Sequence, residues 1–96
     1  MFWMLIYDLV DDYLQRRAAL RSDHLELATA AHARGELVLA GALADPADQA
    51  FLVFRADEPA IVEGFVERDP YVRNGLVKEW RIRPWTVVIG ADADHG

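Results

Sequence analysis

The chain has 96 residues, of which 53% are hydrophobic, so it is long enough for one domain with a single core. Its net charge of −6 argues against nucleic acid or an anionic membrane as a partner, because both bind basic surfaces. Without cysteine it has no disulfide and no thiolate metal ligand, and we expect a cytoplasmic protein. The expected partners are a small-molecule ligand and a second copy of the chain.

The first stretch, MFWMLIYDLV, is apolar but lacks a basic flank and a cleavage site, and it is shorter than the roughly 20 residues of a membrane span. We interpret it as a strand from Phe2 to Val10 with apolar side chains on both faces. One layer of helices covers only one face, so the other face needs a separate partner.

A helix is expected to begin at Tyr13, after Asp11 and Asp12, and to end at Gly35. Ser22 offers a second possible N-cap, so the helix is either continuous or broken near this residue.

The part of this helix after Arg17 places a histidine on the buried side. At about 100° per residue, His24 shares a face with apolar residues. These are Leu20, Leu27, Ala28 and Ala31. If the helix is continuous, Arg17 and Arg21 lie on one stripe with His24, at positions i, i+4 and i+7. The sequence therefore predicts a cationic rim around an imidazole.

The middle of the chain predicts an antiparallel hairpin, because two strand patterns are joined by a short turn rich in Asp and Pro. The first strand runs from Glu36 to Leu43 and is interrupted by Gly41, which marks a bulge or a close approach of another backbone. The second strand runs from Ala50 to Ala56.

A second helix follows, capped by Asp57 and with Pro59 in its first turn. Asp69 lies on its buried side at the end, where Pro70 stops the helix. Residues Tyr71 to Gly75 are expected to form a loop.

The last strand pattern runs from Val77 to Arg83, and Pro84 is expected to interrupt it. Trp85 to Ile89 is then an edge strand or a continuation after a bulge. The order strand, helix, strand, strand, helix, strand predicts an α+β, ferredoxin-like βαββαβ fold with two helices on one face of an antiparallel sheet. Residues 1–90 form this single domain and residues 91–96 a disordered tail. A homodimer packing sheet against sheet would cover the free face.

His24 and Asp69 are the candidate catalytic residues. Each has an ordinary alternative: a buried histidine satisfied in the core, and an aspartate that accepts hydrogen bonds from backbone N–H groups in a turn. Both helices pack on one sheet face, however, so their inward side chains can meet. An aspartate beside a histidine fixes its tautomer and leaves the other ring nitrogen free as a general base or acid.

Arg17 and Arg21 are candidate substrate-binding residues, because guanidinium groups recognise carboxylates and enolates. Alternatively they are solvated or paired with acidic neighbours, namely Asp11, Asp12 or Glu26. Tyr71, two residues after Asp69, is a candidate lining residue of the same pocket.

No metal and no cofactor is expected. His24, His32 and His95 do not cluster at metal-ligand spacing, and the chain has no glycine-rich phosphate loop. No serine or cysteine is placed as a nucleophile.

Several short motifs occur in order along the chain. They are an apolar first strand, Arg17 and Arg21 ahead of His24-Leu25, then Gly35, Ala40-Gly41, Asp69-Pro70-Tyr71 with Gly75, and Arg83-Pro84-Trp85. In this order and spacing the chain resembles the YCII-related family, the small YciI-like proteins, over nearly its whole length. The Asp69-Pro70-Tyr71 segment after a helix, with His24-Leu25 upstream, is the most specific part.

This resemblance implies a dimeric α/β barrel similar to muconolactone isomerase, with a His and Asp active site that maps onto His24 and Asp69. A family member that acts on a chlorinated hydroxyhydroquinone suggests lyase or dehydrochlorinase chemistry for some members. The chain departs from the family at Ala42, where a proline often follows the glycine, and at Ala50, where a glycine often opens the third strand.

The sequence thus predicts a small cytoplasmic, homodimeric enzyme of lyase, isomerase or hydrolase type. His24 would act as general acid and base, and Asp69 would orient it. The substrate would be a small anionic or aromatic compound, held by Arg17 and Arg21. The alternative is a non-catalytic dimeric ligand-binding or accessory module in which the His24–Asp69 pair is structural.

Overall fold

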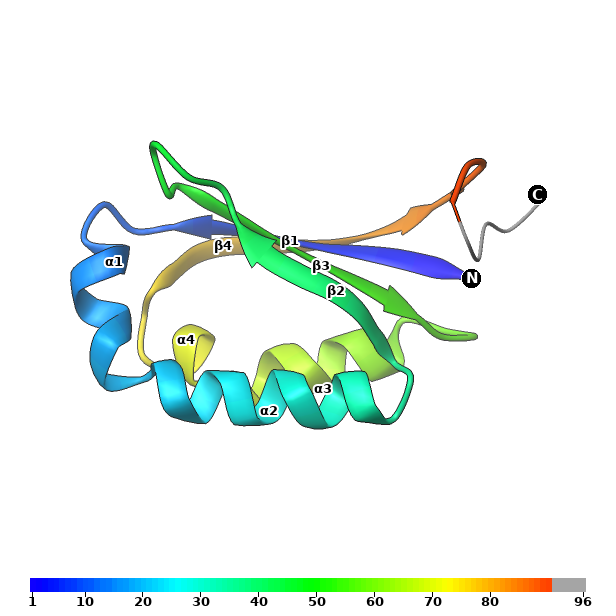
Figure 1. Cartoon of the computed structure of the whole chain (residues 1–96), viewed down its shortest axis with the longest axis horizontal. Coiled ribbons are helices and arrows are strands. Elements are labelled where there is room, and N and C mark those ends of the chain that lie inside the picture. Colours follow the sequence, from blue (N-terminus) through cyan, green and yellow to red (C-terminus); the bar gives the residue numbers. More distant parts are fainter. Residues whose placement is uncertain (91–96) are drawn as a thin grey trace.

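A computed structural model describes residues 1–90, which form a sheet with helices along one face (Figure 1). The elements are β1 (Phe2–Leu9), α1 (Tyr13–Arg16), the 3-10 turn η1 (Arg17–Ala19), α2 (Arg21–Ala33), β2 (Leu37–Ala42), β3 (Gln49–Arg55), α3 (Ala60–Arg68), α4 (Pro70–Arg73) and β4 (Val77–Trp85). The four strands are antiparallel in the order β2-β3-β1-β4. This is the predicted ferredoxin-like arrangement, so the expected fold class is confirmed.

The core lies between the inner face of the sheet and helices α2 and α3. Alternate residues of the central strand β1, namely Leu5, Tyr7 and Leu9, are buried there, as the period of two predicts. Helix α3 contributes Val62, Phe65 and Val66, and α2 contributes Ala31. The predicted inward set of Leu27 and Ala28 on α2, with Leu20 just before the helix, packs against this cluster and is partly buried.

The opposite face of the sheet carries the other apolar set of β1 together with its neighbours on β2 and β3, whereas the β4 edge of this face carries Arg81 and Arg83. The strand register places Met4 opposite Val53, Ile6 opposite Phe51 and Leu39 opposite Val53. No helix in the part of the chain that the structure describes covers this side (Figure 1). We call these five residues the outer face. The expectation that both faces of the first strand are apolar is confirmed.

The first helical region is broken, and the break lies at Leu20 rather than at Ser22. Leu20 keeps right-handed helical backbone angles between η1 and α2 and precedes the helix without a side-chain cap. Ser22 is exposed inside the first turn of α2, so its proposed capping role is wrong. Leu20 is partly buried against the core at this break, and no side chain caps the start of α2. Arg17 therefore belongs to η1 and not to a continuous helix.

Two further boundaries differ from the sequence prediction. The N-cap of α3 is Pro59, without a side-chain hydrogen bond, so Asp57 is not the cap. Residues after Asp69 form the short helix α4 instead of the expected loop. The Asp69 side chain accepts a hydrogen bond from the Tyr71 backbone N–H, and Pro70 occupies the first turn, where its fixed φ suits a helix.

Two strand features also differ. The irregularity in β2 falls between Leu37 and Leu39, whereas Gly41 is regularly paired with Phe51. Strand β4 continues through Pro84, opposite Trp3, because β4 is an edge strand and its missing N–H needs no partner on the free side. The tail predicted for residues 91–96 lies outside the described residues.

Candidate functional site

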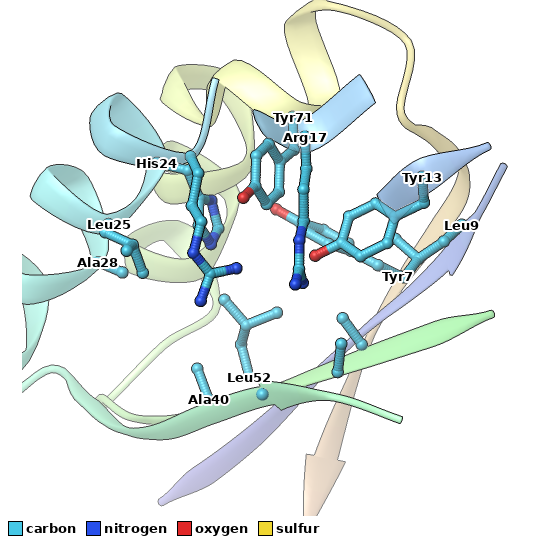
Figure 2. A pocket seen from close by; sticks show the side chains of 14 residues that line it. Tyr7, Leu9, Tyr13, Arg17, His24, Leu25, Ala28, Ala40, Leu52 and Tyr71 are labelled. Carbon is cyan, nitrogen blue, oxygen red and sulfur yellow. The ribbon is translucent and has the colours of Figure 1, made fainter. Parts of the chain in front are cut away.

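A cavity of about 180 Å³ lies between helix α2, the turn η1 and the inner face of the sheet (Figure 2). An engineered cavity of about 150 Å³ accommodates benzene, so this volume suits a compound with one ring. The polar lining residues are Tyr7, Tyr13, Arg17, Arg21, His24 and Tyr71; the remainder are apolar or glycine. The structure thus brings four of the five predicted site residues to the wall of one cavity, and the fifth, Asp69, lies behind His24.

Asp69 is fully buried and accepts three hydrogen bonds. Its Oδ1 lies 2.8 Å from His24 Nδ1 and 3.0 Å from the Tyr71 backbone nitrogen, which donates to it. Its Oδ2 accepts from the Tyr7 hydroxyl at 2.8 Å. The two interpretations weighed for Asp69 therefore hold together: it contacts His24, and it satisfies a backbone donor at the start of α4.

The orientation of the His24 ring follows from these contacts. A carboxylate only accepts, so Nδ1 carries the hydrogen and, in the neutral imidazole, Nε2 carries the free lone pair. Nε2 makes no hydrogen bond within residues 1–90 and is not enclosed. The Tyr71 ring stacks on the imidazole, with centroids 3.9 Å apart and planes 8° from parallel. His24, whose side chain is 14% exposed, thus presents a basic nitrogen from a fixed ring.

Arg17 borders the cavity from η1 (Figure 2). Arg21 borders it from the first residue of α2. Among the described residues neither arginine forms an ion pair with a carboxylate. The alternative that they pair with Asp11, Asp12 or Glu26 is therefore not observed. Asp12 Oδ1 instead lies 3.9 Å from Arg16 Nη1. The Arg17 guanidinium lies 5.3 Å from the Tyr13 ring centroid. The site therefore offers two cations whose charge no neighbouring side chain neutralises.

Tyr7 and Tyr13 also line the cavity, although the sequence did not predict them as site residues. Tyr7 is almost fully buried on the inner face of β1, and burial raises the pKa of its hydroxyl, with the neighbouring Asp69 carboxylate adding to the effect. The hydroxyl therefore stays protonated and donates. The sequence holds one indication of this role for Tyr7: a tyrosine, not a phenylalanine, stands at a fully buried strand position. A buried hydroxyl needs a hydrogen-bond partner. Tyr13 packs edge-on against Tyr71, with centroids 5.7 Å apart.

The described part of the chain contains no group of three His, Asp or Glu side chains that could hold a metal ion. His32 lies on the same helix as His24 but bonds the Leu37 carbonyl through Nδ1 at 2.7 Å, and His95 lies outside the described residues. No helix between residues 1 and 90 is long and apolar enough to cross a bilayer. The absence of a cofactor and the cytoplasmic location stay predictions.

Comparison with known proteins gives a family and solved structures of similar fold. The YCII-related domain matches residues 1–86. The fold is similar to that of 5-chloro-2-hydroxyhydroquinone dehydrochlorinase (TftG) from Burkholderia phenoliruptrix AC1100, solved in complex with 2,5-dihydroxybenzoquinone, with a TM-score of 0.78 and 21% sequence identity. The match covers 92% of this chain and 96% of that chain. No curated protein matches the sequence. At this identity the structural likeness establishes a shared fold.

Proposed function

The chain belongs to the YCII-related family, and from this premise we propose that it is an enzyme performing general acid and base chemistry on a small anionic or aromatic compound. One observation carries the proposal: the free nitrogen of a carboxylate-held histidine borders a cavity that also presents two guanidinium groups, neither of which forms an ion pair within residues 1–90. His24 is the proposed acid and base, and Asp69 the residue that orients it. Arg17 and Arg21 are proposed to bind the substrate.

Proton transfer to His24 depends on the hydrogen bonds that Asp69 accepts. When His24 Nε2 takes a proton from the substrate, the imidazole becomes a cation, and the carboxylate 2.8 Å from Nδ1 stabilises that charge. Tyr7 and the Tyr71 backbone N–H hold the carboxylate on its other lone pairs. The base is therefore preorganised and needs little rearrangement during the reaction.

We propose that Arg17 and Arg21 stabilise the negative charge that this proton transfer leaves on the substrate. Removing a proton from a hydroxyl, or from a carbon next to a carbonyl, leaves negative charge on an oxygen of the substrate. Arg17 and Arg21 line the same cavity as His24, and we propose that they donate hydrogen bonds to that charge. Return of the proton at another atom gives an isomerase, and expulsion of a leaving group gives a lyase.

The comparison supports a ring-shaped substrate. TftG is named for a chlorinated hydroxyhydroquinone, and its structure holds 2,5-dihydroxybenzoquinone, a single ring with ionisable oxygens. A cavity of about 180 Å³ beside two arginines is compatible with a ligand of that size and charge. The reaction proposed for this chain is of lyase, isomerase or hydrolase type.

We also propose that the protein is a homodimer in which two sheets pack through the outer face. This face is apolar, and Leu39 on it is 64% exposed in the single chain. A second copy would remove these side chains from water.

A second candidate function has its own support. The three hydrogen bonds on Asp69 are also what a purely structural buried carboxylate needs. In that case the protein is a dimeric ligand-binding or accessory module that binds a similar compound but converts nothing.

The test combines binding and turnover in two histidine variants. The wild-type protein is titrated with 2,5-dihydroxybenzoquinone and assayed with 5-chloro-2-hydroxyhydroquinone, and His24→Gln is compared with His32→Gln. We expect His24→Gln to lower turnover by about 10²- to 10⁴-fold, and His32→Gln, on the same helix but outside the cavity, to match the wild type. Equal turnover in His24→Gln and wild type would refute a catalytic His24. Binding without turnover in the wild type would favour the module.

A further inference from the structure

The Tyr71 hydroxyl is the one buried side-chain polar atom within residues 1–90 that has no hydrogen-bond partner. Tyr71 is only 2% exposed, yet its side chain lines the cavity and its hydroxyl lies on the cavity side of the ring (Figure 2). Burying a hydroxyl without a partner is unfavourable, and folded proteins rarely keep such a group without a reason.

No acceptor within residues 1–90 lies at hydrogen-bond distance from this hydroxyl. The guanidinium groups of Arg17 and Arg21, which act on it electrostatically, contain donors only. Burial raises the pKa of Tyr71, and Tyr13 adds to this, while Arg21 and Arg17 oppose it. The net effect keeps the hydroxyl protonated at neutral pH, so it has a hydrogen to donate and nothing in the ligand-free protein to receive it.

The stacking of Tyr71 on His24 relates this donor to the proposed base. The two rings are nearly parallel, with centroids 3.9 Å apart, and both border the cavity. A small ligand in this cavity would therefore have both the Tyr71 ring and the His24 ring on its wall.

We propose that the Tyr71 hydroxyl donates a hydrogen bond to an ionised oxygen of the substrate, which Arg17 and Arg21 bind at the same time. The substrate is then an enolate- or phenolate-forming compound whose charged oxygen lies beside the atom that exchanges a proton with His24. This inference rests on the proposed function and narrows its substrate class. Tyr71 supplies a stabilising donor at the position where the charge develops.

An unpaired buried hydroxyl lowers the stability of the ligand-free protein. Tyr71→Phe keeps the ring that stacks on His24 and removes only the unpaired hydroxyl. The melting temperature of the ligand-free variant should therefore rise by about 4–8 °C, as expected when one unsatisfied buried polar group is removed from a domain of this size. Residues that serve a ligand at the expense of stability behave in this way.

The experiment measures both properties in Tyr71→Phe and wild type. Thermal unfolding is followed in the ligand-free proteins, and binding is measured with 2,5-dihydroxybenzoquinone and with 2,5-dimethoxybenzoquinone, which has the same ring but no ionisable oxygen. We expect the variant to bind the dihydroxy compound at least about tenfold more weakly, the effect of losing one hydrogen bond to a charged group. Binding of the dimethoxy compound should change less than twofold.

Other outcomes overturn the inference in distinguishable ways. A lower melting temperature in Tyr71→Phe would mean that the hydroxyl has a structural partner. Unchanged affinity for the dihydroxy compound would mean that the ligand does not use it, and the proposed function would stand if His24→Gln still abolished turnover. If the wild type bound neither compound, the proposed function and this inference would fail together.

Discussion

Asp69 shows how one side chain links the local fold to the candidate chemistry. It begins helix α4 by accepting from the Tyr71 N–H, and it also holds His24 and Tyr7. A loss of stability on changing Asp69 is therefore expected whether or not the protein is an enzyme. His24 is the more informative residue, because its side chain is partly exposed and one of its nitrogens is free.

We predict that Asp69→Asn destabilises the protein by about 1–3 kcal/mol, since an amide cannot accept all three hydrogen bonds and at least one buried donor is left unpaired. Urea unfolding at neutral pH measures the change. Asp23→Asn is the control, because Asp23 is exposed on α2. Unfolding curves of Asp69→Asn and wild type that coincide would contradict the hydrogen-bond arrangement around Asp69.

Tyr7→Phe removes the hydrogen bond from the Tyr7 hydroxyl to Asp69, which the sequence did not predict. The substitution keeps the buried ring and leaves Asp69 Oδ2 without its donor, so we expect a loss of about 1–3 kcal/mol in the free energy of unfolding. We also expect slower turnover with little change in the affinity for 2,5-dihydroxybenzoquinone, because Tyr7 positions the carboxylate behind His24. A variant as stable and as active as the wild type would show that the bond contributes nothing.

At the scale of elements, the break between η1 and α2 decides how the arginines reach the cavity. Arg17 comes from a 3-10 turn and Arg21 from the first residue of α2, so they approach from two segments rather than from one helical stripe. The helical wheel predicted their proximity to His24 but assumed a continuous helix. Their convergence depends on how Tyr13 and Leu20 pack against the core.

The three strands β1, β3 and β4 are joined at one point by Asp8, which accepts from Gln49 at 2.9 Å and from Arg81 at 2.9 Å. These hydrogen bonds, that from Arg81 first, lower the pKa of Asp8 below its ordinary value of 3.8. A carboxyl whose pKa is lower in the folded state contributes stability above its unfolded pKa. It loses that contribution as the pH falls through the folded value.

We therefore predict that wild type melts at a higher temperature than Asp8→Asn at pH 6, and that the difference shrinks as the pH falls below about 4. Thermal unfolding between pH 6 and pH 2 measures it. Asp57→Asn, at an exposed position, should show no comparable trend. A difference between wild type and Asp8→Asn that stays constant over this range would contradict the role of the charge.

At the scale of the whole molecule, the helices cover one face of the sheet, and the outer face is left for a partner (Figure 1). Ile6 and Phe51 lie opposite each other at the centre of the sheet, on the two middle strands. A charge placed there would be buried against apolar side chains in a dimer packed sheet against sheet, which is unfavourable.

If the proposed homodimer forms, we predict that Phe51→Glu makes the protein monomeric, whereas Ile61→Glu does not, because Ile61 is exposed on α3, on the helical side. Size-exclusion chromatography with light scattering gives the mass of each, and circular dichroism checks that both variants fold. A wild-type mass of about 10.8 kDa, that of a single chain, would contradict the dimer.

The sequence by itself determined the order of the elements and the fold class, because hydrophobic periods of two and 3.6 report which faces leave water. It also predicted that His24 and Asp69 meet, since inward residues of two helices on one sheet face are brought together by that fold. Residue identity and motif order were enough for the family. None of these conclusions needs more than local pattern and topology.

Only the tertiary structure decided the surroundings of that pair. The bond between Tyr7 and Asp69 joins residues 62 positions apart, and the unpaired hydroxyl of Tyr71 is defined by what the whole fold places around it. The break at Leu20 and the helix α4 also differ from local expectation. Side-chain hydrogen bonds and helix ends depend on distances of a few tenths of an ångström that the complete packing sets, and a one-dimensional pattern does not contain these distances.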